Sequence, residues 1–192
     1  MCIRDRGYFV NGTLRDTSDI TKVKYLNKLP NSNNLELFNA KMENKKDFIN
    51  PMQNVDAVFI ACLIPTYKGN DGTPAKDMDD KRGYEEIINP TVNGCLNIIK
   101  AAKDKGIKNI IICSSTSSTN PVPPIEFKNE TEHWSDEKEQ CKAKKYTSAT
   151  KTVMEKMAIK YCEENDIRLS IILPTGLYLS LIHISEPTRP LY

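Results

Sequence analysis

The chain has 192 residues, of which 39% are hydrophobic and 27% charged, with a net charge of +2. This composition supports one packed domain and is too apolar for a disordered chain. The small net charge predicts no general affinity for nucleic acid, and no apolar run reaches the roughly 20 residues that cross a bilayer. The six cysteines include no C-x-x-C pair, which disfavours a metal site and is typical of reduced thiols. We therefore expect a cytoplasmic domain without a metal, nucleic-acid or membrane partner.

The two ends of the chain differ from the sequence between them. Residues 1–6 (MCIRDR) and 179–192 (LSLIHISEPTRPLY) have no periodic pattern that joins the rest. Both strings resemble translated sequencing-adapter read-through, although a genuine arm and tail are the alternative. We expect residues 7–178 to be the native part, a fragment of a longer protein.

Strand and helix patterns alternate along residues 7–178. Continuous apolar runs and β-branched segments predict strands at residues 8–14, 35–38, 57–63, 109–113 and 168–173. Helical spacing of apolar residues predicts helices at residues 19–29, 46–52, 84–105 and 147–165. In the last of these helices we expect Val153, Met157, Ala158 and Ile159 to face the core. Residues 65–83 and 120–145 are expected to be long loops.

This alternation predicts an α/β fold with a doubly wound parallel sheet and helices on both of its faces. Such sheets bind ligands at the carboxyl ends of their strands. We therefore expect functional groups in the residues that directly follow each strand and in the two long loops.

Two cations follow the first predicted strand. Arg15 comes directly after it, and Lys22 lies in the next predicted helix. In a dinucleotide-binding fold an Arg here accepts a 2′-phosphate, whereas an acid selects a free ribose hydroxyl. Asp16 could act in that second way, and a solvated surface pair of Arg15 and Lys22 is the simpler alternative.

Hydroxyl and amine groups mark two further places. The run CSSTSST, residues 113–119, follows a buried strand and could bind a substrate carbonyl, although turn formation explains Ser and Thr equally well. Tyr146 could act as a general acid if the ammonium of Lys151 lay beside it, because a nearby positive charge lowers the pKa of a phenol. Their spacing of five residues separates them by about 140° on a regular helix. A helix that begins after Tyr146 would relieve this separation; otherwise Tyr146 is an ordinary amphipathic residue.

Taken together, the segments resemble an extended short-chain dehydrogenase/reductase of the NAD-dependent epimerase/dehydratase superfamily. The likeness is strongest to the branch of dihydroflavonol reductases and cinnamoyl-CoA reductases. It rests on GYFVNGTLRD with KVKYL, NPTVNGCLNIIKAAKDKGIKNIIICSS, HWSDEKEQCKAKK and TKTVMEKMAIKYCEENDIRLSIILPTGLY, which follow the order of that family.

The resemblance implies a Rossmann-like fold and a set of site residues. Arg15 and Lys22 fall where the family holds the 2′-phosphate of NADPH, and Pro174 and Thr175 fall beside the nicotinamide. Ser115 falls on the catalytic Ser, and Lys151 on the Lys that binds the nicotinamide ribose and tunes a Tyr. The family position of that Tyr is occupied by Thr147, so Tyr146 would be a shifted substitute.

The Gly-rich turn of the family is missing. No G-x-x-G-x-x-G occurs in the chain, and the strand before that turn is missing with it. In the strand order 3-2-1-4-5-6 this strand lies between residues 8–14 and 57–63. We expect a truncated sheet with exposed strand edges, poor NADPH binding and marginal stability.

The function implied is an NADPH-dependent oxidoreductase that reduces a carbonyl group of a small molecule, with NAD the less favoured cofactor. Ser115 would hold the oxygen, Tyr146 would donate the proton and Lys151 would bind the ribose. A nucleotide-sugar epimerase or dehydratase is an alternative that Arg15 disfavours. A non-catalytic dinucleotide-binding sensor or scaffold is an alternative that the Tyr146 spacing favours. Neither the substrate nor the oligomeric state follows from the sequence.

Overall fold

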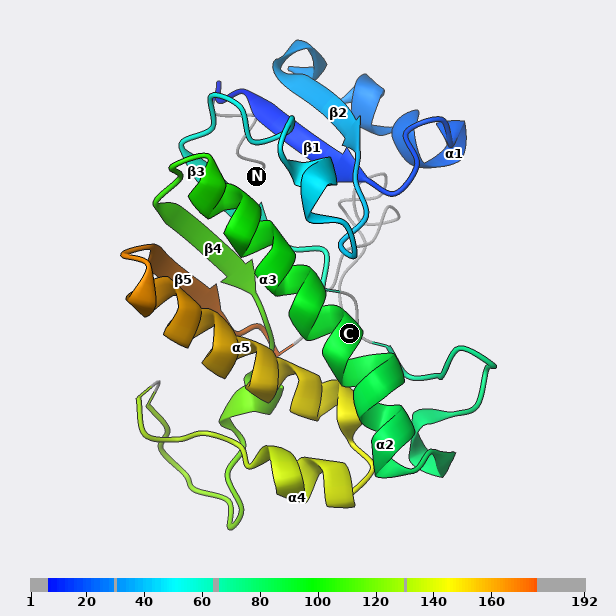
Figure 1. The fold of residues 1–192 in the computed structure, drawn as a ribbon, viewed down its shortest axis with the longest axis vertical. Helices are drawn as coiled ribbons and strands as arrows, with labels where there is room; N and C mark the ends of the chain where they lie inside the picture. The colour runs from blue at the N-terminus through cyan, green and yellow to red at the C-terminus, as the bar shows by residue number, and fades with distance from the viewer. Residues whose placement is uncertain (1–6, 30, 64–65, 130, 176–192) are drawn as a thin grey trace, which may run out of the picture.

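The structure is a computed structural model that describes residues 7–29, 31–63, 66–129 and 131–175 (Figure 1). Both expected non-native ends, residues 1–6 and 179–192, lie outside the described residues, as do residues 176–178 at the end of the expected native part. All five predicted strands are present in the described part, in the predicted order.

The strands form two parallel sheets. In the first, β1 (Val10–Leu14) pairs with β2 (Leu35–Asn39), so that Leu14 lies opposite Asn39. In the second, the order is β3-β4-β5, with β3 at Ala57–Ile60, β4 at Asn109–Cys113 and β5 at Arg168–Ile172. Among the described residues, no strand joins β1 to β3. The interruption is at the place where the sequence lacks the expected strand.

Helix α3 (Asn89–Asp104) continues from a π-helical turn at Gly83–Ile88, and together they correspond to the predicted helix 84–105. The apolar residues whose helical spacing predicts this helix are buried, namely Ile87, Ile88, Val92, Leu96, Ile99 and Ala102. Gly106 ends the helix with a left-handed φ of +73°. Its N–H bonds to the Lys103 carbonyl at 2.9 Å, and the Ile107 N–H bonds to the Ala102 carbonyl at 3.0 Å. This Schellman motif directs the chain into β4.

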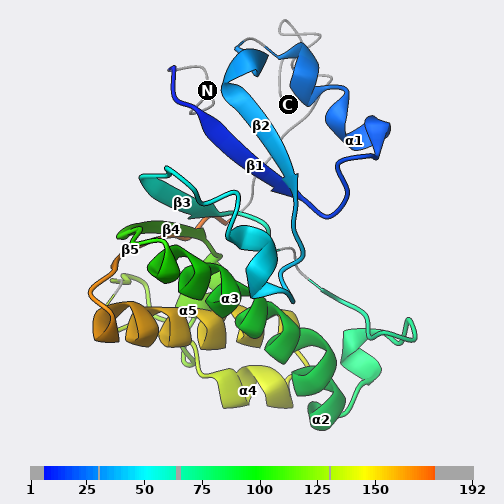
Figure 2. The same ribbon diagram turned by 45° about the horizontal axis from the view of Figure 1, so that its top comes forward.

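Helix α5 (Tyr146–Glu164) lies beside α3, and both cover the same face of the β3-β4-β5 sheet (Figure 2). The opposite face exposes Phe59 and Ile172, at 55% and 56%. The described helices therefore cover one face of this sheet and not both as expected. The described part of the crossover between β1 and β2, which would supply a covering helix, forms only the four-residue α1 (Ile20–Val23) and two 3-10 turns, at Leu26–Lys28 and Ser32–Asn34.

The predicted inward face of α5 is partly wrong. Ala158 is buried, but Met157 is 44% exposed, and Val153 and Ile159 are only half-buried. Several buried positions on α5 are polar instead, namely Thr150, Lys151, Thr152 and Glu155. An apolar pattern could not identify this face, because its polar groups are buried through specific hydrogen bonds.

The two predicted loops contain short helices. Residues 66–83 include a 3-10 turn at Ala75–Asp77 and α2 (Asp80–Arg82). Residues 120–145 include α4 (Glu137–Lys142), whose N-cap Asp136 accepts the backbone N–H of Lys138 at 2.7 Å. The predicted helix at 46–52 is a 3-10 turn at Lys45–Phe48, and further 3-10 turns occur at Ser32–Asn34 and Thr116–Thr119.

Gly83 provides a test of the contact between the start of α3 and the start of α5. A β-carbon at Gly83 would overlap the ring of Tyr146. Gly→Ala within a helix normally stabilises by about 1 kcal/mol. Here we expect Gly83→Ala to destabilise by about 1–3 kcal/mol because of overpacking. Urea unfolding measures the change, with Lys81→Ala on the exposed side of α2 as control. An unchanged or increased stability would contradict the packing.

Candidate functional site at the carboxyl ends of the strands

The ends of β4 and β5 are joined by backbone hydrogen bonds. The N–H of Ser114 donates to the Ile172 carbonyl at 2.9 Å, and the N–H of Thr116 donates to the Pro174 carbonyl at 3.4 Å. Ser115 lies between these two bonds. The structure therefore brings Ser115 together with Pro174, and Thr175 follows as an exposed residue.

Ser115 caps the 3-10 turn at Thr116–Thr119. Its extended backbone, with φ −159° and ψ 150°, turns the chain out of β4, and its hydroxyl oxygen accepts the N–H of Ser117 at 3.3 Å. The turn is fixed from outside, since Ser135 Oγ and Gln140 Nε2 both donate to the Ser117 carbonyl, at 2.7 and 2.9 Å. The Ser115 hydroxyl keeps its proton for donation, as binding of a carbonyl oxygen requires.

Lys151 reaches the same edge from α5. Its Nζ donates to the Leu63 carbonyl, just beyond β3, at 2.9 Å, and the side chain is 6% exposed. Burial lowers the pKa of Lys151, while nearby groups that include Cys113 and Glu155 oppose this change. Ser115 and Lys151 therefore both lie at the carboxyl end of the β3-β4-β5 sheet, as predicted for a dinucleotide fold.

Tyr146 points elsewhere. It is fully buried, and its hydroxyl donates to Asp80 Oδ1 at 2.7 Å and accepts from Lys144 Nζ at 3.0 Å. Burial and the hydrogen bond to Asp80 raise the pKa of Tyr146, which disfavours the phenolate. Helix α5 begins at Tyr146 itself, so the separation of about 140° from Lys151 is not relieved.

The structure thus does not bring Tyr146 and Lys151 together, and the role of Tyr146 as proton donor stays a prediction. Thr147 is four residues before Lys151 and shares its helix face. The Thr147 hydroxyl donates to the Thr66 carbonyl, in the loop after β3.

The two predicted phosphate-binding cations lie on the other sheet. Arg15 is exposed directly after β1, and Lys22 forms an exposed ion pair with Asp19 at 2.8 Å. The charges of Lys151 and Arg15 both reach Cys62, after β3, where they oppose the burial that raises the pKa of this thiol. Asp16 is engaged locally, because its Oδ1 accepts the N–H of Ser18 at 2.9 Å.

The chemistry of these side chains is compatible with a nicotinamide dinucleotide phosphate. Arg15 and Lys22 are cations of the kind that bind a phosphate, and the Ser115 hydroxyl and the Lys151 amine are donors of the kind that bind a carbonyl or a ribose. The described residues contain no Gly-rich turn for the pyrophosphate, in agreement with the sequence. They also contain no group of three or more acidic, Cys or His side chains that could hold a metal ion.

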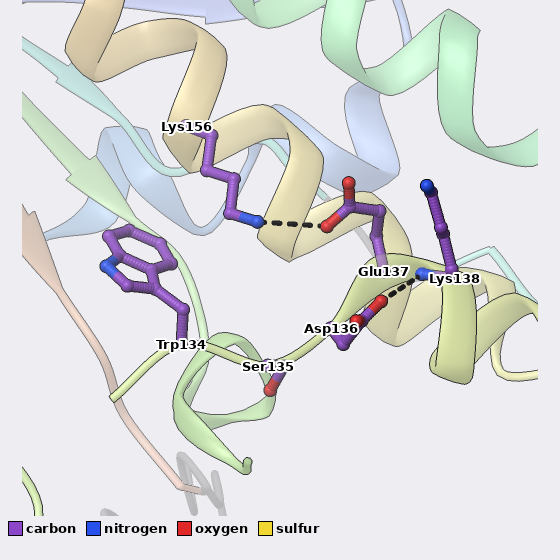
Figure 3. A pocket seen from close by; sticks show the side chains of 6 residues that line it. All are labelled: Trp134, Ser135, Asp136, Glu137, Lys138 and Lys156. Carbon is purple, nitrogen blue, oxygen red and sulfur yellow. Dashed lines mark hydrogen bonds and ion pairs between the residues drawn. The ribbon is translucent and has the colours of Figure 1, made fainter. Parts of the chain in front are cut away.

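A surface pocket beside α4 is a different feature (Figure 3). It is lined by Trp134, Ser135, Asp136, Glu137, Lys138 and Lys156. Lys156 is paired with Glu137 at 2.9 Å, and Asp136 caps α4. Its charges are used to hold α4 against α5, and we assign it no ligand.

Comparison with known proteins identifies the chain's relatives. A family described as NAD(P)H-binding matches residues 3–178. The chain belongs to this family. The predicted class of cofactor is thereby confirmed, as is the predicted Rossmann-like fold, since the solved structures described below share it.

The curated relatives are plant reductases. The chain is 32% identical to a bifunctional dihydroflavonol 4-reductase/flavanone 4-reductase of Malus domestica, over 91% of this chain and 49% of that protein. It is 32% identical to a dihydroflavonol 4-reductase of Arabidopsis thaliana, over 97% and 47%. An anthocyanidin reductase of Vitis vinifera is 31% identical, over 88% and 49%. The chain thus spans about half the length of these relatives.

Solved structures show the same fold. Vestitone reductase from alfalfa superposes with a TM-score of 0.65 at 24% identity, over 89% of this chain and 50% of that one. The UDP-glucose 4-epimerase of Thermus thermophilus with NAD gives 0.62 at 14% identity, over 88% and 48%. Both the reductase and the epimerase folds therefore resemble this chain, as the predicted superfamily implies. No helix in the described part of the chain is long and apolar enough to cross a membrane.

The sequence analysis did not identify two acidic residues that form hydrogen bonds at or beside the predicted site residues. Asp80 holds the Tyr146 hydroxyl at 2.7 Å, and it lies at the start of the short α2, in a segment without a recognisable motif. Glu155 is buried one turn after Lys151 and bonds to Ser114. The spacing of Lys151, Glu155, Ala158 and Cys162 on one helix stripe was a usable signal for Glu155.

The contact between Tyr146 and Asp80 predicts a pH-dependent contribution to stability. We expect Tyr146→Phe to cost about 1 kcal/mol near pH 7, because it removes hydrogen bonds of a buried hydroxyl. Bonds from Tyr146 and Lys144 hold the pKa of Asp80 below its ordinary value of 3.8. The ionised carboxylate thus stabilises the fold above that value, and its contribution is lost as the pH falls through the lowered pKa.

The difference in unfolding free energy between the two proteins should therefore shrink as the pH falls below 3.8 and through the lowered pKa of Asp80. Urea titrations at neutral and acidic pH measure it, with Tyr161→Phe on the partly exposed side of α5 as control. A difference that stays constant with pH would contradict the bond to Asp80.

Proposed function

We propose that the protein is an NADPH-dependent reductase of a carbonyl group on a small molecule, of the dihydroflavonol type. The observation that carries the proposal is the placement of Ser115 and Lys151 at the carboxyl ends of β4 and β3, in a chain of an NAD(P)H-binding family. The named activities of the dihydroflavonol, anthocyanidin and vestitone reductases support a reductase of flavonoid-like substrates. Because the chain spans about half of its curated relatives, the proposal concerns the whole protein.

Each residue has a proposed role. NADPH supplies the hydride when it is bound. Ser115 donates a hydrogen bond to the substrate oxygen, and the Lys151 ammonium binds the nicotinamide ribose. Arg15 and Lys22 bind the 2′-phosphate.

Pro174 and Thr175 flank the nicotinamide in this proposal. Tyr146 donates the proton to the substrate oxygen, for which its hydroxyl must exchange the bond to Asp80 for one to the substrate.

We also propose that this chain alone binds NADPH weakly, because the residues that would bind it belong to two separate sheets. Titration followed by NMR reaches weak affinities and can compare NADPH with NADH. We expect NADPH to bind more tightly than NADH, and Arg15→Ala to reduce NADPH affinity roughly tenfold or more with little effect on NADH. Arg168→Ala, at the amino end of β5 on the opposite edge, is the matched control. Equal affinities for the two nucleotides in the unchanged protein would refute the role of Arg15.

Turnover tests the catalytic roles. With NADPH and a dihydroflavonol, we expect Ser115→Ala and Tyr146→Phe each to slow reduction at least about a hundredfold. Thr147→Val, which occupies the position one turn before Lys151, should change the rate only slightly. The opposite ranking of Tyr146→Phe and Thr147→Val would move the proton transfer to Thr147 or to a water beside it.

A non-catalytic dinucleotide-binding sensor is the second candidate. The engagement of the Tyr146 hydroxyl with Asp80 and Lys144 favours it. NADPH binding without turnover of dihydroflavonol, flavanone or vestitone would support the sensor over the reductase.

A further inference from the structure

Glu155 is a buried carboxyl group that the proposed reaction does not use. It is 1% exposed and lies on α5, one turn after Lys151. Its Oε1 accepts a hydrogen bond from the Ser114 hydroxyl. A buried carboxylate without a partner would destabilise the fold, and here the Ser114 hydroxyl is that partner.

Glu155 and Lys151, one turn apart on α5, bond to the residues that follow two neighbouring strands. Ser114 directly precedes Ser115, and its N–H is bonded to β5 through the Ile172 carbonyl at 2.9 Å. Lys151 projects from the same helix face as Glu155 and bonds to the Leu63 carbonyl after β3 at 2.9 Å. Through the bond between Glu155 and Ser114 and the bond between Lys151 and Leu63, α5 is attached to the ends of both β4 and β3.

The charges in this cluster are mutually dependent. Burial raises the pKa of Glu155, whereas hydrogen bonds from Ser114 and Ser118 and the charge of Lys151 lower it. Burial lowers the pKa of Lys151, and the charge of Glu155 opposes that change. The thiols that face Lys151 are Cys113 of β4, Cys95 of α3 and Cys62 after β3. Burial raises the pKa of Cys62 and of Cys95, which keeps these two thiols neutral at pH 7.

We propose that Glu155 is a positioning residue: its charge, one turn from Lys151 in the same buried cluster, keeps the amine of Lys151 protonated, and its bond to Ser114 anchors the helix that places this amine at the end of β3. The significance of this for cofactor binding rests on the proposed function of Lys151. The coupling between Glu155 and Lys151 is a property of the chain alone, and it can be measured without a cofactor.

Trace acetylation measures the coupling. Acetic anhydride labels only neutral amines, and mass spectrometry of the Lys151 peptide at a series of pH values gives the pKa of that amine. Glu155→Gln keeps the size of the side chain and an acceptor for Ser114 but removes the charge. We expect its Lys151 pKa to fall, with about tenfold more acetylation at a fixed pH below the pKa. Glu163→Gln, an exposed change on the same helix, should leave labelling unchanged.

The direction of the change separates positioning from a merely structural role. If Glu155→Gln only loosened the packing, Lys151 would become more exposed and its pKa would rise toward the ordinary 10.5. Ser114→Ala is the second variant, should Glu155→Gln not fold. It removes a hydrogen bond that favours the ionised carboxyl group, so we expect a smaller fall of the Lys151 pKa. A rise, or no change, in the variants that fold would overturn the proposal.

A parallel arm with NADPH tests the function separately. Protection of Lys151 from acetylation by NADPH, and less by NADH, is expected if the amine binds the nicotinamide ribose beside a held 2′-phosphate. Labelling that NADPH leaves unchanged at saturation, together with an intact effect of Glu155→Gln, would overturn the cofactor role of Lys151 and leave the coupling standing.

Discussion

The burial of a polar helix face against the strand ends is the constraint on which the candidate site depends. Helix α5 turns Lys151, Glu155, Thr150 and Thr152 inward, and each is hydrogen bonded. Lys151 binds the Leu63 carbonyl at 2.9 Å, and Thr152 binds Gln140 of α4 at 2.9 Å. Unpaired, any of these groups would cost about 1–3 kcal/mol or more. The helix can therefore pack in only one register, and that register determines where the ends of β3 and β4 lie.

The same helix separates two groups that a reductase of this type would bring together. At its first residue, the Tyr146 ring packs against Gly83 and its hydroxyl bonds to Asp80 of α2 at 2.7 Å. One and a half turns later, the Lys151 amine lies at the end of β3. Because the helix is regular between them, moving the phenol to the amine requires a change at the start of α5, where Lys144 has a positive φ of 56°. The bond to Asp80 and the contact with Gly83 oppose that change.

The hydrophobic periodicity of the sequence predicted correctly those elements whose apolar residues are also the buried ones. The apolar run of β4 and the stripe of α3 were found within a few residues, because burial and period agree there. The predicted helix 19–29 was wrong in extent: Ile20 and Tyr25 are 72% and 57% exposed, and a short helix without a packed face is marginal. For the site, the strand-end rule predicted that Ser115 and Pro174 follow strands at one edge of the sheet, whereas Lys151 was named from its helix motif and the family resemblance. The direction of the Tyr146 side chain could not be predicted, because it depends on distant residues. Asp80 lies in the short α2, and Gly83 lies in the turn before α3.

The residues of the candidate site are divided between two sheets. Arg15 and Lys22 follow β1 of the first sheet, whereas Ser115 and Lys151 belong to the second, and no described strand pairs β1 with β3. A ligand that contacts both sets must fix the two sheets relative to each other, and the free energy of that ordering is subtracted from its affinity. The same ligand, once bound, stabilises the folded arrangement by mass action. A contact that joined β1 to β3 in advance would lower this ordering cost and thereby raise the affinity for such a ligand.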